Sequence, residues 1–247
     1  MLRRCVAMAL LAAGSRACLT YEYEHEIWLR VDGSGTVNVT GRPALWTAFK
    51  GLGDPKSPDA TATRDAARAL FERSGLRVRR VTLTRRGGHP YLFVSADFSD
   101  VNALSGTAAF PDLALGLRRE KGRLLLDGRW ARPPAARDIG PGDKEGLLAV
   151  RLHLPSKVYS HRNAADGVER GNIVSWRQDV AQALEGRALD VGAEMDERSI
   201  LVSTVLLFGT AIVLALAILF AIYWAVVRRG RRDLAQAESK RGTGGPP

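Results

Sequence analysis

An uninterrupted run of uncharged residues near the C-terminus constrains this chain more than any other feature. Residues 200–227, ILVSTVLLFGTAIVLALAILFAIYWAVV, contain no Asp, Glu, Lys or Arg. A helix needs about 20 apolar residues, each rising about 1.5 Å, to cross about 30 Å of hydrocarbon. A helix buried in a soluble protein rarely stays apolar on every face over such a length. The run therefore predicts a transmembrane helix over residues 200–227.

The residues that flank this run predict its orientation. Tyr223 and Trp224 stand near its C-terminal end, where amphipathic rings favour the headgroup layer. Four arginines follow at once: Arg228, Arg229, Arg231 and Arg232. Because loops rich in Lys and Arg stay in the cytoplasm, residues 228–247 are predicted to form a cytoplasmic basic tail. We thus expect a single-pass protein of the cell membrane, with its C-terminus cytoplasmic and everything before the helix outside.

The N-terminus has the features of a secretory signal. Arg3 and Arg4 supply the positive charge, residues 5–13 form a short apolar stretch, and the small residue Ala17 suits the cleavage position. This stretch is too short for a transmembrane anchor, which is the alternative reading. Residues 1–17 are therefore predicted to be a signal peptide, and residues 18–199 an exported domain.

Cys18 would be the first residue of the mature chain. A bacterial lipoprotein carries its diacylglyceryl group on a cysteine at this position, but here Ser15 stands where Leu is usual and Arg16 where a small residue is usual. Two alternatives stay open, lipidation of Cys18 or ordinary cleavage that leaves a free thiol, and mass spectrometry of the mature N-terminus separates them. Since the other cysteine, Cys5, lies in the signal, the domain has no internal disulfide and depends on its core.

The charge of the chain is mostly a consequence of this topology. The formal net charge is +10, but nine of the 36 basic residues lie in the signal and the tail. The exported segment keeps 27 basic and 24 acidic residues, a net charge of about +3. The basic composition therefore gives no support to nucleic-acid binding.

The segment VDGSGTVNV, residues 31–39, resembles a ligand-binding loop at first sight. Apolar and polar residues alternate through residues 21–31 and again after Gly35, which is typical of two β-strands. A phosphate-binding loop would need Gly-Lys-Ser/Thr and a following helix, and a calcium loop would need more carboxylates. The glycines suit a tight hairpin turn, so we predict a β-hairpin and no ligand role for Asp32 or Ser34.

The middle of the chain predicts one helix and two more hairpins. SPDATATRDAARALFERSG, residues 57–75, places apolar residues at helical spacing and ends on a glycine. Residues 76–98 predict a hairpin that turns at Gly87-Gly88, with a bulge between Val78 and Val81. LALGLRREKGRLLLDGRW, residues 113–130, predicts another hairpin that turns at Lys121-Gly122.

The end of the exported segment predicts a loop and three short strands. Residues 131–146 concentrate Pro, Gly and charge without periodicity, so we expect an exposed loop. Residues 147–155, 171–176 and 188–195 then predict strands. The predicted fold class is α+β, a mainly antiparallel β-sheet with one or two packed helices, plus the C-terminal transmembrane helix.

Motifs that carry chemistry are scarce. No two of the four histidines are spaced as neighbouring ligands on one helix face: His25, His89, His153 and His161. His153 and His161 could meet across neighbouring strands, but no cysteine or carboxylate motif accompanies them. The contexts of Ser105 and Ser175 do not resemble a nucleophile elbow. We predict no catalytic, cofactor-binding or metal-binding residues, and hence no enzyme.

The order of features along the chain resembles a known family. A signal that ends before a cysteine, the hairpin YEYEHEIWLRVDGSGTV, the strand GNIVSW and one transmembrane helix with an arginine-rich tail are similar to the LppM-type domain of bacterial envelope lipoproteins. The resemblance implies a membrane-anchored domain with a lipid-binding type of fold, and an envelope lipid or glycolipid as ligand. Residues 118–146 have no counterpart in it.

Two hypotheses about function follow. In the first, the exported domain is a binding domain whose cavity beneath the sheet accepts a lipid or glycolipid tail. The residues expected to line that cavity are Ile27, Leu29, Val37, Leu92, Val94, Val150, Leu152 and Trp176. In the second, it is a non-enzymatic interaction subunit that docks on protein partners in a larger envelope complex. The first needs more inward apolar surface than the packing of the domain itself can fill, whereas the second needs an exposed apolar patch.

Overall fold

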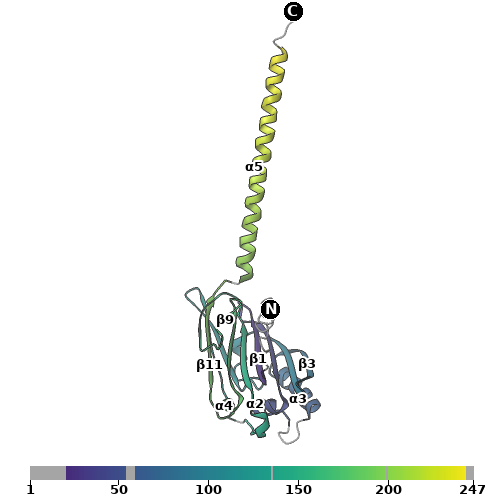
Figure 1. The fold of residues 1–247 in the computed structure, drawn as a ribbon, viewed down its shortest axis with the longest axis vertical. Helices are drawn as coiled ribbons and strands as arrows, with labels where there is room; N and C mark the ends of the chain where they lie inside the picture. Colours follow the sequence, from purple (N-terminus) through teal and green to yellow (C-terminus); the bar gives the residue numbers. More distant parts are fainter. Residues whose placement is uncertain (1–20, 54–58, 135, 199, 243–247) are drawn as a thin grey trace, which may run out of the picture. The chain divides into compact units, whose positions relative to one another are not determined.

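The structure, a computed structural model, describes residues 21–53, 59–134, 136–198 and 200–242. The predicted signal peptide and Cys18 lie outside the described residues. The chain divides into two compact units, Met1–Ser199 and Ile200–Pro247. We refer to the first as the globular unit (Figure 1).

The larger of two sheets in the globular unit has the strand order β3-β4-β2-β1-β7-β10-β9. Its strands are β1 (Tyr23–Leu29), β2 (Gly35–Gly41), β3 (Arg77–Arg86), β4 (His89–Phe98), β7 (Leu147–His153), β9 (Val168–Glu169) and β10 (Ile173–Asp179). Every neighbouring pair is antiparallel except β1 and β7, which run parallel. The parallel pair joins strands more than 100 residues apart in the chain, which local sequence patterns could not predict.

The smaller sheet has the order β5-β6-β11-β8 and is antiparallel throughout. Its strands are β5 (Leu113–Glu120), β6 (Arg123–Trp130), β8 (Val158–Arg162) and β11 (Leu189–Asp196). The mainly antiparallel α+β fold predicted from the sequence is therefore confirmed, but its strands form two sheets rather than one.

The three predicted hairpins are all present. In the first, β1 and β2 pair around Asp32 and Gly33, and Gly33 has a φ of +85°. The Asp32 carboxylate accepts hydrogen bonds from the Ser34 backbone N–H at 3.0 Å and the Ser34 hydroxyl at 2.7 Å. These bonds close the turn on itself, as expected of an Asx-type turn. The hairpin β3–β4 contains the predicted bulge, after Val78.

Three helices of the described chain pack against the larger sheet. The predicted helix is α3 (Ala60–Arg73), and the Asp59 carboxylate accepts hydrogen bonds from two backbone N–H groups of its first turn. The sequence analysis did not predict α2 (Pro43–Lys50), all of whose residues are buried. Pro43 in its first turn and Gly51 in the left-handed conformation at its end are the usual boundary signals, but eight residues are too few to display a helical period. A second short helix, α4 (Val180–Leu184), was missed for the same reason.

One contiguous core joins the two sheets and the helices. It includes Val37 of β2, Phe49 of α2, Phe71 of α3 and Leu126 of β6. The predicted loop 131–146 carries only a 3₁₀ turn, Pro141–Asp143, although Ile139 in the loop is buried. Because residues 21–198 contain no cysteine, this core accounts for the stability of the described part of the unit.

The second unit is a single long helix, α5 (Ile200–Gly242). Its segment Thr204–Arg231 has a mean hydropathy of 2.9, so its length and composition are compatible with membrane anchoring. The helix begins where the sequence predicts and continues beyond residue 227 into the arginine-rich segment, so much of the predicted tail is helical.

Candidate functional site

The residues expected to line a lipid cavity all lie in the core of the globular unit. Leu29 is 5% exposed and the other seven are exposed by 1% or less. They belong to the same cluster of packed side chains: Ile27, Leu29, Val37, Leu92, Val94, Val150, Leu152 and Trp176. The structure therefore brings the eight together, on the core faces of β1, β2, β4, β7 and β10, as mutual packing partners.

The pockets of the globular unit lie elsewhere. One pocket, of about 480 Å³, is lined mainly by polar and charged residues around Arg177, Asp179 and Arg187. Another, of about 210 Å³, lies over β6, β8 and β11, where Asp127 binds Arg118 at 2.9 Å and Arg162 at 3.2 Å. None of the eight predicted residues lines these two pockets or the pockets beside Asp100 and Arg132.

A group of ionisable side chains lies inside the core, and we call it the ionic cluster: Tyr23, His25, Lys50 and Asp112. The Lys50 ammonium donates to Asp112 Oδ1 at 2.8 Å, and the Tyr23 hydroxyl donates to Asp112 Oδ2 at 3.0 Å. The ammonium also donates to the carbonyl of Ala109 at 2.5 Å. The cluster links β1, the last residue of α2 and the residue before β5, so it connects the two sheets through α2.

His25 is the unsatisfied member of the ionic cluster. Its Nε2 lies 3.5 Å from Asp112 Oδ2, yet neither ring nitrogen has a hydrogen-bond partner in the described structure. The ring instead packs edge-on against Tyr23, with the ring centroids 5.2 Å apart. Burial lowers the pKa of His25 to about 3, more than the nearby Asp112 raises it. The imidazole is therefore neutral at physiological pH, and its contact with Asp112 is not an ion pair.

Burial and the Lys50–Asp112 pair act on the pKa values of the other three members in different directions. Burial also lowers the pKa of Lys50, against the opposing effect of Asp112. Burial would raise the pKa of Asp112, but Lys50, His25 and the hydrogen bonds lower it overall. Burial and the Asp112 carboxylate raise the pKa of Tyr23 well above its ordinary value. Because the side chains of His25, Lys50 and Asp112 are fully buried, a substrate cannot reach them in this conformation.

Sequence reasoning identified His25 only as a histidine in an alternating strand, and it missed Lys50 and Asp112. Lys50 ends a helix too short to be predicted, and Asp112 stands in a loop 62 positions further along the chain. Their proximity depends on long-range packing, so no local pattern marks it.

The remaining histidines do not form a site. His153 lies on β7, where its Nε2 is 2.9 Å from Glu26 Oε1 and its ring stacks on that of Trp28. His161 lies on β8 of the other sheet, opposite Ala193. The interpretation that His153 and His161 could meet across neighbouring strands is therefore wrong, because the two strands belong to different sheets. No group of three or more His, Cys, Asp or Glu within the described ranges could hold a metal ion.

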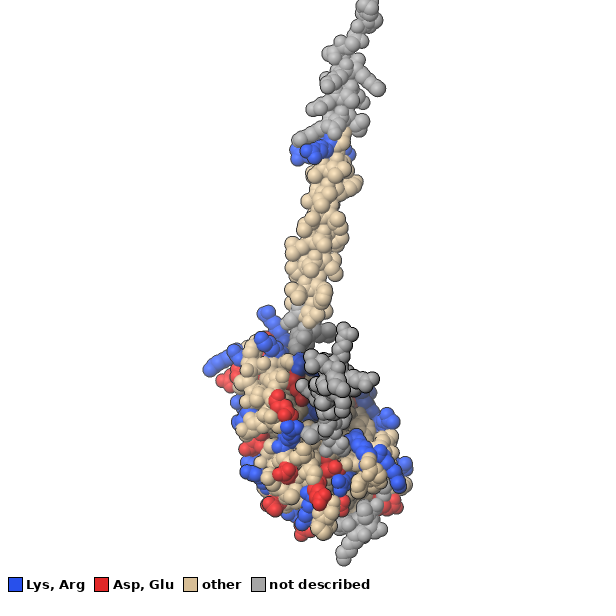
Figure 2. Space-filling view, viewed as in Figure 1, with Lys and Arg blue, Asp and Glu red and all other residues tan. Residues whose placement is uncertain are grey.

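The exposed surface of the globular unit is charged rather than apolar. Among its described residues, the large hydrophobic side chains that are exposed are Trp28, Tyr159 and Val168. They lie on β1, β8 and β9. In contrast, basic and acidic side chains are spread over the face of the unit that Figure 2 shows. A binding surface on this unit is thus expected to depend on charge.

Comparisons with known proteins show a distant similarity to a solved structure. No protein-family model matches the chain, and no curated protein is significantly similar to it. Among solved structures, the chain is similar to the NMR structure of the folded domain of LppM from Mycobacterium tuberculosis. The two share 14% sequence identity with a TM-score of 0.41, over 74% of this chain and 94% of the other. The comparison is compatible with a distant LppM-like fold, and membership of that family stays a prediction.

Proposed function

We propose that the chain is a membrane-anchored, non-enzymatic interaction domain that binds its partner on the outer surface of the globular unit. The observation that carries this proposal is the filled core. All eight residues expected to line an internal cavity pack against one another and are at most 5% exposed. An internal ligand would have to displace this packing, and filled protein interiors have few voids. The inaccessible ionic cluster likewise supports a structural role.

A lipid or glycolipid ligand, the other function expected from the sequence, stays a prediction. The measurement that separates the two is native mass spectrometry of residues 19–199, produced without the helix and mixed with an envelope lipid extract. We expect this unit to emerge without a bound lipid, because its core has no room for an acyl chain. One lipid retained per chain would contradict the proposal.

The variant Val150→Phe serves as a matched test of the same point. In a filled core the added ring forces neighbouring side chains out of position and should destabilise the unit by about 1–3 kcal/mol. In a lipid-binding cavity the ring would occupy free space, with little change in stability and with loss of lipid retention. Urea unfolding of the wild type and the variant measures the difference.

The second part of the proposal concerns orientation. The uncharged part of α5, residues 200–227, is followed within the same helix by Arg228, Arg229, Arg231 and Arg232, and such clusters are retained in the cytoplasm. We therefore propose that α5 spans the cell membrane once, with the globular unit outside. Protease added to intact cells or spheroplasts should remove the globular unit and leave a C-terminal tag protected. A protected globular unit with an accessible tag would reverse the orientation.

A further inference from the structure

The net positive charge of the exported segment, residues 18–199, is concentrated on one hairpin. The hairpin β3–β4 contains five arginines and one aspartate, a net charge of +4. That exceeds the net charge of about +3 for the whole exported segment, so the rest of the segment is slightly acidic. All five arginines are exposed: Arg77, Arg79, Arg80, Arg85 and Arg86. Figure 2 shows basic side chains along the side of the unit on which Figure 1 labels β3.

Strand β3 is also an open edge. It forms one end of the larger sheet and, within the described part of the chain, pairs only with β4. After the bulge, its register with β4 is regular from Arg80 to Arg86. This regular stretch is longer than the average strand of about 5–6 residues, so it can pair with an added strand. Its free edge presents backbone N–H and C=O groups that no described residue satisfies.

The two faces of this stretch differ. Val81 and Leu83 stand opposite the buried Val94 and Leu92, so they point to the core side. Arg80, Thr82, Thr84 and Arg86 alternate with them and share the opposite face. An added strand would therefore meet a polar, basic row on one face and a partly buried apolar row on the other.

Part of the basic charge is already neutralised at one end of the strand. Arg77 binds Asp97 at 2.6 Å and Arg79 binds it at 2.7 Å. Burial would raise the pKa of Asp97, but these two arginines and Thr36 lower it to about 2, so the carboxylate is fully charged. No carboxylate in the described ranges lies within ion-pair distance of Arg80, Arg85 or Arg86, although the Arg86 guanidinium lies over the Tyr91 ring, 5.1 Å from its centroid, and attracts the Glu24 carboxylate. The unpaired guanidinium groups thus coincide with the regular part of the edge.

A charged edge has an ordinary explanation, since charges on edge strands prevent pairing between copies of the same protein. Two β3 edges brought together would place arginines opposite arginines, which is unfavourable. The same charges favour a strand of opposite sign, because guanidinium groups bind carboxylates in bidentate geometry. The arginines therefore disfavour pairing with a second copy of β3 and favour pairing with an acidic strand.

We propose that β3 accepts an extended, acidic segment of a partner protein as an additional strand of the larger sheet. The segment would alternate acidic residues, facing Arg80 and Arg86, with apolar residues beside Val81 and Leu83. Backbone hydrogen bonds along the edge would supply affinity, and the alternating side chains would supply specificity. This inference rests on the proposed function, because it names the partner class of the interaction domain.

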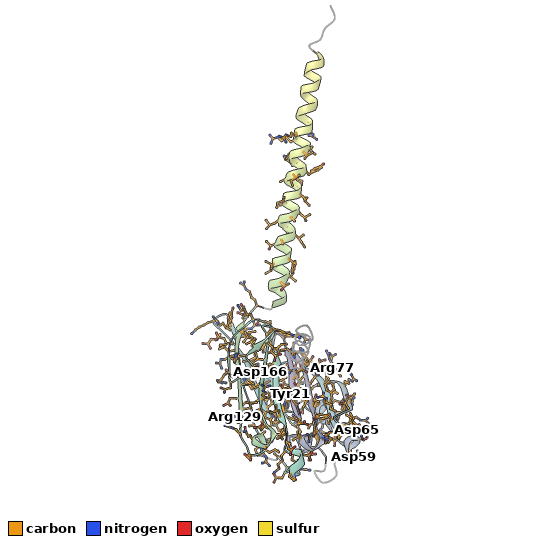
Figure 3. The ribbon with its side chains drawn as sticks, in the orientation of Figure 1. Tyr21, Asp59, Asp65, Arg77, Arg129 and Asp166 are labelled. Atoms are coloured by element: carbon orange, nitrogen blue, oxygen red, sulfur yellow. The ribbon has the colours of Figure 1, made fainter. Side chains whose placement is uncertain are left out.

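The test uses the full chain in nanodiscs of zwitterionic phospholipid and a fluorescent peptide of alternating glutamate and valine. We expect saturable binding by fluorescence anisotropy, weakened by salt. The double variant Arg80→Glu/Arg86→Glu should weaken it by more than about tenfold, which corresponds to about 1.4 kcal/mol. The control Lys121→Glu/Arg129→Glu makes the same charge change in the hairpin β5–β6. Figure 3 labels Arg129 on the opposite side of the unit from Arg77, and this variant should bind as the wild type does.

A second peptide separates strand addition from general electrostatic attraction. It has the same sequence and charge but carries an N-methyl group on every backbone amide nitrogen, so it cannot donate backbone hydrogen bonds from either edge. Loss of its binding supports the proposal, whereas equal binding overturns it. The proposal is also overturned if neither peptide binds. The same holds if the chain binds anionic vesicles but no peptide, and Arg80→Glu/Arg86→Glu abolishes the vesicle binding. These outcomes leave the lipid-retention measurement unaffected, so failure of the inference and failure of the proposed function are distinguishable.

Discussion

Replacing Asp112 by Leu is expected to destabilise the globular unit by about 3–5 kcal/mol, because it leaves the ammonium of Lys50 buried without its counter-ion. Both side chains are fully buried and their charged atoms are 2.8 Å apart. Lys50→Met should have a comparable effect, because it leaves the carboxylate of Asp112 buried without its counter-ion. Urea unfolding, followed by the fluorescence of the buried Trp46, Trp130 and Trp176, measures each loss.

The double variant Lys50→Met/Asp112→Leu tests the cause. It removes both charges together, so its loss should be smaller than the sum of the two single losses and close to or below either one. Arg129→Met breaks an exposed ion pair with Asp190 and serves as the control, with an expected change under about 1 kcal/mol. If the single variants lose less than about 1 kcal/mol, or if the losses simply add, the ionic cluster does not act as a coupled buried pair.

Acid is expected to destabilise the globular unit through His25. Above its ordinary pKa of 6.5 the imidazole is neutral in the folded and the unfolded chain, so its protonation does not change the free energy of unfolding with pH. As the pH falls from 6.5 towards the folded pKa of about 3, the unfolded chain binds a proton that the folded chain cannot bind. Stability should then fall by up to about 1.4 kcal/mol per pH unit, or about 4–5 kcal/mol in all. The lowered pKa of Asp112 adds a further loss at lower pH, as its carboxylate is protonated.

The variant His25→Phe isolates this contribution. Phe keeps the ring that packs against Tyr23 but cannot bind a proton, so the difference in stability between wild type and variant should shrink or reverse as the pH falls. Urea unfolding at a series of pH values between about 7 and 4 measures the two curves. His89→Gln, which removes an exposed histidine of the β3–β4 hairpin, controls for the loss of a surface histidine. Parallel curves for wild type and His25→Phe would contradict a pKa lowered by burial.

Features that depend on short stretches of chain were predicted well. The alternation around residues 31–39 predicted the hairpin β1–β2, because a strand exposes its two faces at every second residue and glycines permit the turn. The slip between Val78 and Val81 predicted the bulge that β3 contains. The apolar run predicted the membrane-compatible part of α5, because an uncharged run of this length is longer than the roughly 20 residues that a helix needs to cross a bilayer.

Features that depend on contacts between distant residues were not predicted. The short helix α2 is buried on all sides, but its eight residues are too few to display a helical period in the sequence. The apolar strand faces were predicted to point inward, and they do, but alternation cannot tell a filled core from a cavity. Likewise, His153 and His161 both lie on strands, yet strand patterns do not say which sheet a strand joins.

By itself, the sequence determined the hairpins, the helix α3, the class of fold and the membrane-compatible helix, because each is encoded by neighbouring residues with a characteristic period or length. Only the tertiary structure decided the parallel pairing of β1 with β7, the burial of Lys50 with Asp112, and the isolation of the charged edge β3. Each of these depends on which surfaces meet when the whole chain packs. Which surfaces meet depends on the total buried area and on the pairing of every buried charge, and neither quantity can be read from a single segment of the sequence.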